Sequence, residues 1–229
     1  MVTNIYLIRH AEAEGNAKEF FQGNIDTPLT ERGEQQLESL AERFRDIPLA
    51  ALYFSPYQRT RLTAEAVNRY HDLPMQPEYD LREINGGDWE GRRIADLAAA
   101  FPESYGTWLH HMGDFQAPNG DAMLDVYRRM YCIITQIAWN YPGRNVAVVS
   151  HGCAIRNFLC YAEFRDIHRL GDVGWADNTA VSLVAFDSGT GKFSLVFKND
   201  SSHLPEALST MRHAGWLKKE NELRAGDSE

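Results

Sequence analysis

The stretch IYLIRHAEAEGN (residues 5–16) begins as an apolar run and then places an arginine and a histidine side by side. A short run that is apolar on both sides of the chain is typical of a central strand covered on both faces. ALYFS (51–55) and NVAVVSH (145–151) have the same character. We therefore expect three buried strands, with Arg9 and His10 at the end of the first.

Helical patterns separate these strands. In TERGEQQLESLAERF (30–44), apolar residues recur at helical spacing behind Thr30, which suits an N-cap. A strand, a helix and a second strand predict a crossover connection and a largely parallel sheet. In the segment that follows, Ser55 is expected to cap the next helix and Pro56 to take its first position, so that Arg59 falls in the first turn.

The rest of the chain fits one domain over residues 1–217. The segment at about 86–120, with its glycine pair, aromatic residues and APNG turn, predicts an insertion over the sheet. A long helix of about twenty residues is expected from about Asp121. NTAVSLVAF and KFSLVF, joined by DSGTG, predict an antiparallel hairpin, and the polar residues 218–229 a flexible tail.

Composition excludes several classes of protein. The 229 residues are 44% apolar, enough for a sizeable core, and their 32 acidic against 23 basic residues argue against a nucleic-acid partner. Without a signal-peptide pattern or a long apolar run, we expect a cytoplasmic protein that does not contact a membrane. Cys132, Cys153 and Cys160 form an odd set without a metal-type CxxC pair, which predicts reduced thiols.

Charged residues recur where the predicted strands end. Arg9 and His10 end the first strand, Arg59 opens the helix after the second, and His151 and Gly152 join the third strand to a helix. Ligands of open α/β sheets bind beyond the carboxyl ends of the strands, near helix N-termini. Two arginines, two histidines and a helix N-terminus would form a cationic site suited to a phosphoryl dianion.

Isolated turn residues or a metal site would account for this cluster less well. A single histidine after a strand is usually a turn residue, and an isolated arginine is usually solvated, but here four such residues coincide. His10 and His151 lack carboxylates at metal-ligand spacing, and arginines would repel a cation, so we expect neither a metal nor a cofactor. Phe186 stands where a Walker loop needs glycine, and no cysteine is followed by an arginine six residues later. A histidine nucleophile remains.

LIRHAEAEGN resembles the signature of the histidine phosphatase superfamily, the phosphoglycerate-mutase-like proteins, and further matching segments follow in family order. They are QGNIDTPLTERGEQQ (22–36), SPYQRTRLTAE (55–65), LREINGGDWEGR (81–92), PNGDAM (118–123) and VSHGCAIRNF (149–158). No single motif is decisive, but the ordered set spans most of the chain. The resemblance implies a three-layer α/β/α sandwich with a mostly parallel sheet and a small helical insertion over the active site.

The resemblance also implies roles for five residues. His10 attacks phosphorus and becomes a phosphohistidine, Arg9, Arg59 and a protonated His151 hold the phosphoryl oxygens, and Glu83 is the proton donor. A neutral imidazole, with an ordinary pKa of about 6.5, is nucleophilic at cellular pH, and a covalent intermediate divides one difficult displacement into two steps. The cations would stabilise charge on the transferring group.

Weaker matches complete the expected site. Asn16 and Gln22 match positions that reach into the phosphate or substrate site, and Gly152 joins them at the helix N-terminus. Ala11 replaces a glycine that is common in the family, a small change that should be tolerated. The Gly120–Ala122 loop departs from the family pattern, which leaves its role open.

Three functions are compatible with these residues. Hydrolysis of a small phosphorylated metabolite is the leading hypothesis, because the mutases' tyrosine three residues after the acid glutamate is replaced by Gly86. Neither adjacent arginine pair, Arg92–Arg93 or Arg128–Arg129, matches the pair that the resemblance implies for mutases. A phosphoglycerate mutase is the alternative, and a catalytically silent module that binds phosphate esters is the third.

Substrate choice is expected to depend on the insertion, which offers apolar and aromatic surface. The residues concerned are Trp89, Tyr105, Trp108, His110, Met112 and Phe115. The partner is then a small-molecule phosphate ester. The sequence leaves its identity, and the formation of a homo-oligomer, open.

Overall fold

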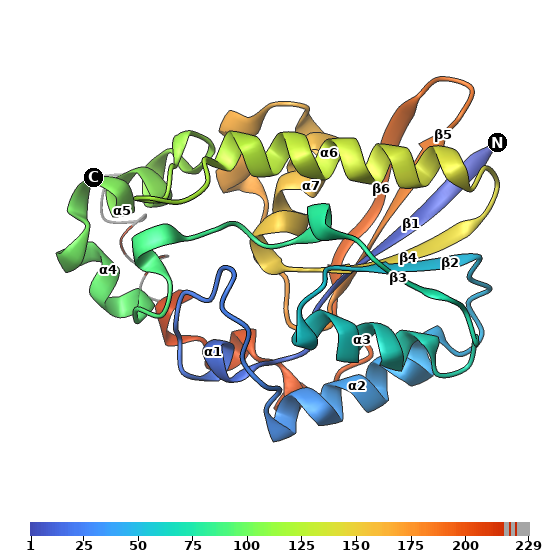
Figure 1. The fold of residues 1–229 in the computed structure, drawn as a ribbon, viewed down its shortest axis with the longest axis horizontal. Coiled ribbons are helices and arrows are strands. Elements are labelled where there is room, and N and C mark those ends of the chain that lie inside the picture. The colour runs from blue at the N-terminus through green and yellow to red at the C-terminus, as the bar shows by residue number, and fades with distance from the viewer. Residues whose placement is uncertain (218–219, 221–222, 224–229) are drawn as a thin grey trace.

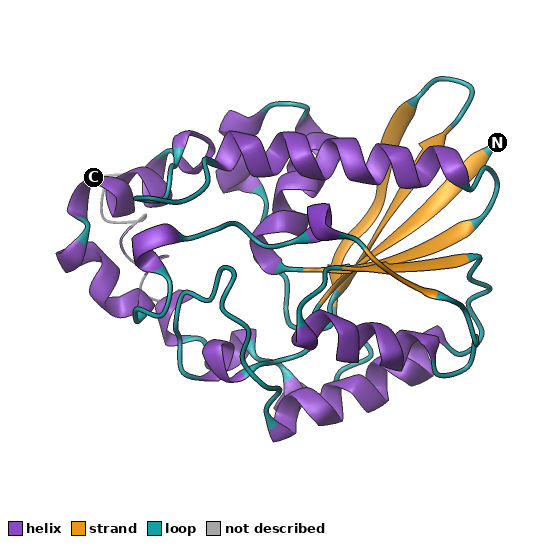
Figure 2. Ribbon diagram, viewed as in Figure 1, coloured by secondary structure: helices purple, strands orange, loops and turns teal. Residues whose placement is uncertain are grey.

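A six-stranded sheet forms the centre of the computed structural model, which describes residues 1–217, 220 and 223 (Figure 2). Its strands are β1 (Val2–Arg9), β2 (Ala51–Phe54), β3 (Met75–Pro77), β4 (Asn145–Ser150), β5 (Val181–Asp187) and β6 (Lys192–Asp200), in the spatial order β3-β2-β4-β1-β5-β6. The first four strands run parallel, and β5 is antiparallel to β1 and β6. The mostly parallel sheet and the β5–β6 hairpin confirm the predictions.

Helices cover both faces of this sheet. The α-helices, including those that lie beyond the faces of the sheet, are α1 (Glu14–Ala17), α2 (Glu31–Phe44), α3 (Gln58–Asn68), α4 (Ile94–Ala100), α5 (Pro102–His110), α6 (Met123–Asn140) and α7 (Gly152–Phe164). Figure 1 shows α2 and α3 on one side of the sheet and α6 and α7 on the other. Helices α4 and α5 lie beyond the end of the sheet at which β1 finishes. The predicted three-layer sandwich is therefore confirmed.

The apolar run of β1 is buried because each face meets a helical layer. Leu7 packs in the cluster that contains α6 and α7, whereas Ile8 packs in the cluster that contains α2 and α3. Successive side chains of a strand point to opposite faces, so a strand without polar alternation is stable only when both faces are covered. Ile5, Leu7 and Ile8 are fully buried, as this requires.

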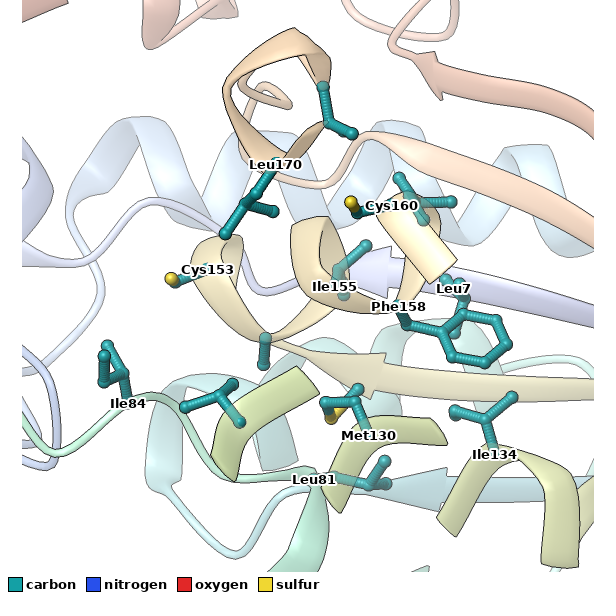
Figure 3. Packing of buried hydrophobic residues seen from close by; sticks show 14 of the residues in the cluster. Leu7, Leu81, Ile84, Met130, Ile134, Cys153, Ile155, Phe158, Cys160 and Leu170 are labelled. Carbon is teal, nitrogen blue, oxygen red and sulfur yellow. The ribbon is translucent and has the colours of Figure 1, made fainter. Parts of the chain in front are cut away.

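Most side chains of helix α7 are buried. Ile155 and Phe158 lie in one apolar cluster with Leu7 of β1 and Ile134 of α6 (Figure 3). A helix that is apolar nearly all round needs partners on every side, and sheet and helices supply them here. The N-terminus of α7 is consequently held in a fixed position at the carboxyl end of β4.

One predicted helix start needs correction. Ser55 does not cap α3 and Pro56 does not take its first position: the helix begins at Gln58 and its N-cap is Tyr57, although Arg59 still lies in the first turn. Helix α6 begins at Met123 and runs for 18 residues, close to the long helix expected from about Asp121. Thr30 does cap α2, because its side chain accepts a hydrogen bond from the Gly33 N–H group.

The insertion at 86–120 contains α4 and α5 joined by loops and short 3₁₀ turns. The expected flexible tail, 218–229, lies outside the described residues except for Glu220 and Leu223, and Glu220 is buried. Within the described ranges, no helix is both long enough and apolar enough to cross a bilayer.

Candidate active site

Parallel pairing of β1 with β4 brings two histidines together. Arg9 lies opposite Ser150 in the register, and the next residue of each strand is a histidine. The His10 N–H group donates to the Ser150 carbonyl at 3.0 Å, and the ring centroids of His10 and His151 are 5.3 Å apart. Both imidazoles are buried. Residues far apart in the chain therefore meet because their strands end at the same edge.

The His10 ring is held in one tautomer. Its Nδ1 lies 2.8 Å from the Ala11 carbonyl oxygen, which can only accept, so Nδ1 carries the proton and Nε2 the lone pair. The methyl group of Ala11 is fully buried beside it, so the departure from glycine is accommodated. Burial, followed by the charges of Arg59 and Arg9, lowers the pKa of His10 well below its ordinary value. The imidazole is thus neutral and oriented.

Two arginines flank this histidine, and each has a nitrogen without a protein acceptor. Arg59 donates to the carbonyl oxygens of Gly23 and Ile25 and to the Asp26 carboxylate, and Arg9 donates to a backbone carbonyl. In the described structure, the buried Nε atoms of Arg9 and Arg59 find no hydrogen-bond partner. Buried guanidinium N–H groups left in this way match an anionic ligand.

His151 lies behind His10 and does not line the cavity. Its Nε2 is 2.8 Å from the Ser55 hydroxyl, and its buried Nδ1 has no partner among the described residues. Burial, then Arg59 and His10, lowers the pKa of His151 well below its ordinary value. Burial and the nearby guanidinium groups oppose a positive charge on His151 while no anion is bound, so its protonation beside a phosphoryl group stays a prediction.

Glu83 reaches the N-terminus of α7. Its carboxylate accepts hydrogen bonds from the N–H groups of Cys153 and Ala154, both at 2.9 Å, and from that of Ile84 at 3.0 Å. These donors include two of the first N–H groups of α7, which have no partner within the helix. The result is a carboxylate fixed in orientation beside the cavity.

One cavity of about 110 Å³ joins these groups. Its lining includes most of the predicted site residues: Arg9, His10, Asn16, Gln22, Arg59, Glu83 and Gly152. Of the insertion residues expected to contact a substrate, Trp89, Tyr105 and Trp108 line it, whereas His110, Met112 and Phe115 do not. The Asn16 oxygen accepts from the Ala13 N–H group, and the Gln22 oxygen accepts from the Thr27 hydroxyl.

A C-terminal segment, residues 206–217 with Glu220, forms part of the cavity wall that sequence patterns did not reveal. Thr210, Trp216 and Glu220 line the cavity. The Thr210 hydroxyl donates to the buried Glu12 carboxylate at 2.7 Å, and the Thr210 N–H group donates to Asp177 at 2.9 Å. The segment is therefore tethered to the loop that follows His10.

Distant residues also support the loop that carries Glu83. Arg129 of α6 donates to the carbonyl oxygens of Asp80 and Arg82, which fixes that backbone. The Gly120–Ala122 loop closes on the same region, because Asp121 and Asn85 exchange two hydrogen bonds of 2.9 and 3.0 Å. Asn178 similarly supports the backbone of His10 by donating to its carbonyl at 2.8 Å. Asn178 is the first residue of NTAVSLVAF (178–186), a stretch that the sequence patterns above predicted only as part of the hairpin.

Thiols and metal ligands contribute little here. The three cysteines are free, and burial raises the pKa of the Cys153 thiol, which lines the cavity, well above its ordinary value. A neutral thiol is a poor nucleophile. Within the described ranges, no three His, Cys, Asp or Glu side chains are grouped so that they could hold a metal ion.

Comparison with known proteins gives a consistent family. The model of the histidine phosphatase superfamily (branch 1) matches residues 5–200. Phosphoserine phosphatase 1 of Hydrogenobacter thermophilus is 28% identical over 206 residues, which cover 90% of this chain and 96% of the relative. The probable phosphoglycerate mutase GpmB of Escherichia fergusonii is 32% identical over 66% of this chain and 70% of its own length.

Among solved structures, Bacillus stearothermophilus YhfR superposes with a TM-score of 0.82 at 29% sequence identity. The superposition covers 88% of this chain and 98% of that protein. The family match over residues 5–200 includes the strand ends that carry Arg9, His10 and His151.

Proposed function

Because the chain belongs to the histidine phosphatase superfamily, we propose that it hydrolyses monoesters of phosphate with small metabolites through a phosphohistidine at His10. Relatives named as phosphatases, phosphoserine phosphatase 1 and an adenosylcobalamin/alpha-ribazole phosphatase of Salmonella typhimurium, support this reaction class.

One observation carries the proposal. The Nδ1–H group of His10 is bound to the Ala11 carbonyl, so the lone pair of Nε2 is available for attack, and buried N–H groups without acceptors surround it. A phosphoryl group in the cavity provides acceptors for the Nε–H groups of Arg9 and Arg59. Two buried guanidinium N–H groups beside an oriented imidazole suit an anionic group that this imidazole can attack.

The first step transfers the phosphoryl group to His10. Nε2 forms the bond to phosphorus as the bond to the ester oxygen breaks, and the arginines stabilise the charge of the transferring group. The bound dianion also favours protonation of His151, whereas the ligand-free site disfavours it. Glu83 gives a proton to the departing oxygen.

The second step hydrolyses the phosphohistidine. Glu83, now a carboxylate, accepts a proton from water as the water oxygen attacks phosphorus and Nε2 leaves. The three backbone N–H groups that bind Glu83 keep its oxygens in place through both steps. Inorganic phosphate then departs, and the neutral His10 is restored.

Hydrolysis is favoured over the mutase alternative by the positions of the remaining arginines. Arg129 is committed to backbone carbonyl groups, and Arg92 donates to the Asp88 carbonyl. Among the described residues that line the cavity, Arg9 and Arg59 are the cations, and both flank His10. A second carboxylate-binding cation, which a phosphoglycerate needs, is not found in that lining.

We extend the proposal to cellular context. The acidic charge balance supports a protein without a nucleic-acid partner. The three free cysteines suit a reducing, cytoplasmic location. The reaction is proposed to need no metal or cofactor, because side chains supply the positive charge. Self-association is left to measurement.

The test is a screen of the purified protein against phosphate monoesters, with phosphoglycerates included and with and without a chelator. We expect release of inorganic phosphate from simple esters to exceed interconversion of phosphoglycerates, and chelation to leave the rate unchanged. Dominant interconversion would establish the mutase alternative. Binding of esters without any turnover would establish the silent module, and loss of activity on chelation that a divalent ion reverses would show a metal requirement.

A further inference from the structure

The backbone around His10 is hydrogen-bonded on both sides of this residue. His10 lies at the phosphate end of the cavity, where two arginines flank it. Its N–H group donates to the Ser150 carbonyl at 3.0 Å, and the N–H group of Ala11 donates to the Thr63 hydroxyl at 2.9 Å. The imidazole depends on this backbone, because its Nδ1 is bound to the Ala11 carbonyl oxygen.

A buried side chain from a distant turn holds the His10 carbonyl. Nδ2 of Asn178 donates to it at 2.8 Å and lies 3.5 Å from Oδ1 of Asn16, a residue of the cavity lining. Both of these oxygen atoms are acceptors, which fixes the carboxamide with its nitrogen toward His10. The planar peptide group between His10 and Ala11 is thus bound by Asn178 at its oxygen and by Thr63 at its nitrogen.

The turn that carries Asn178 is itself held against the end of β1. Thr179 has a left-handed φ of 59°, which is uncommon for a β-branched residue. Its N–H group contacts the carbonyl oxygens of Arg9 at 3.1 Å and His10 at 3.4 Å. On the other side of the turn, the buried Asp177 carboxylate accepts from the Asn178 N–H group at 2.9 Å. A strained backbone persists where surrounding contacts over-determine it, and here those contacts reach His10.

Asn178 has one polar atom that the fold leaves without a partner. Its Oδ1 is buried and has no hydrogen-bond partner among the residues that the structure describes. A buried acceptor of this kind lowers stability, so an apolar side chain would suit packing alone better. The amide is explained instead by what its nitrogen does for His10.

We propose that Asn178 is a positioning residue for phosphoryl transfer: it fixes the peptide between His10 and Ala11, so that the Ala11 carbonyl holds the imidazole with Nε2 toward phosphorus. The inference rests on the proposed function, since it assigns a residue to the step in which His10 attacks. Asn178 is not among the described residues that line the cavity, so it acts through His10. Such alignment matters, because a displacement of about 1 Å can lower a rate about a hundredfold.

The first test compares two variants that lack the donor but differ in volume. Asn178→Leu fills the space of the carboxamide, and Asn178→Ala leaves part of it empty. With an aryl phosphate, rapid-quench measurement should show a rate constant for phosphorylation about thirtyfold lower in both variants. The affinity for inorganic phosphate, measured by calorimetry, should stay within about twofold, because the arginine side chains that bind this ion are unchanged.

The same measurements distinguish positioning from support of the fold. If Asn178 only stabilised the protein, the phosphate affinity and the rate constant would fall together, or neither variant would fold. Either result overturns the inference.

A second readout does not depend on turnover. In protein labelled with ¹⁵N-histidine, the ring nitrogen shifts distinguish the two tautomers, and the His10 signals are those missing from His10→Ala. We expect the Nδ1–H tautomer in the unaltered protein and a mixture of tautomers in both Asn178 variants. If the unaltered protein forms no phosphohistidine but this change occurs, the proposed function fails and the orienting role of Asn178 stands. In an active enzyme, an unchanged rate constant or an unchanged tautomer in the variants overturns the inference.

Asn157→Leu is the matched control. Asn157 is also fully buried, its Nδ2 donates to the Cys153 carbonyl at 3.0 Å, and its Oδ1 has no partner within the described part of the chain. That carbonyl belongs to α7 and not to the residue that attacks phosphorus. We expect Asn157→Leu to keep the His10 tautomer and a phosphorylation rate within about twofold. An equal loss in Asn157→Leu and Asn178→Leu would trace the effect to the buried leucine and overturn the inference.

Discussion

The two histidines beside the cavity and its aromatic lining differ in how the fold builds them. Arg9, His10 and His151 stand at the ends of paired parallel strands, so the register of the sheet sets their positions. Trp108 and Glu220 come from an insertion and from the C-terminal segment, and they meet through side-chain contact. The comparison shows that strand pairing positions one end of the cavity, whereas contacts between distant segments position the other.

The largest expected effect is at the phosphate end. His10→Ala removes the atom that bonds to phosphorus, so turnover should fall by about a thousandfold or more and no acid-labile, base-stable phosphoprotein should form. Rapid-quench labelling and release of inorganic phosphate measure this. His213→Ala, which changes an exposed histidine that does not line the cavity, is the control. Substantial turnover in His10→Ala would refute the covalent route.

Glu83→Gln tests the proposed transfer of a proton to and from the Glu83 carboxylate. We expect a loss of about a hundredfold for alkyl esters and a smaller loss for aryl esters, whose oxygen needs little protonation to leave. Phosphohistidine should accumulate on the aryl substrate, because the second step still needs a base. Equal losses on both ester classes without an adduct would assign the proton transfer elsewhere, and Asp80→Asn or Asp88→Asn would then be compared.

We expect the pH dependence of stability to come mainly from the two histidines at the phosphate end of the cavity. The pKa of His10 and that of His151 are lowered in the folded protein, so below about pH 6.5 the unfolded chain takes up protons that the folded chain does not. As the pH is lowered below this value, the free energy of unfolding should decrease by up to about 1.4 kcal/mol per pH unit for each histidine. His203, at the back of the site, adds to this down to its pKa of about 4.

Urea unfolding between pH 7.5 and 5.5 measures that slope. Saturating inorganic phosphate should flatten it, because a bound dianion favours protonation of the site histidines. A slope that phosphate does not alter would place the anion away from His10 and His151.

The smallest effect is expected where the C-terminal segment is tethered. Thr210→Val removes the hydroxyl that binds Glu12 and Gln36, while the backbone bond to Asp177 remains. We expect KM for bulky aryl esters to rise about threefold and stability to fall by about 1 kcal/mol, with kcat for small esters unchanged. Thr190→Val, in the exposed hairpin turn, is the control. A fall in kcat for every ester would show that the two ends are coupled.

Much of the fold could be predicted from local patterns. Apolar runs predicted β1, β2 and β4, and helical periodicity behind Thr30 predicted α2, because burial on two faces and helix capping depend on neighbouring residues. The start of α3 was predicted incorrectly. Serine is a residue type that favours the N-cap position, but in the fold the Ser55 hydroxyl contacts His151 instead. A tertiary partner outweighed a local preference.

By itself, the sequence determined which candidate site residues stand at the ends of strands and the starts of helices: Arg9, His10, Arg59 and His151 lie at predictable element boundaries, and motif order added Glu83 as a candidate. The tertiary structure alone decided that β4 lies between β1 and β2, that burial and nearby arginines lower the pKa of His151, and that Glu220 reaches the indole of Trp108. The physical reason is the separation, along the chain, of the residues that interact. Strand and helix patterns are set by side chains a few residues apart, whereas strand order, the electrostatic surroundings of a buried group and the docking of a distant segment depend on contacts between residues far apart in the chain.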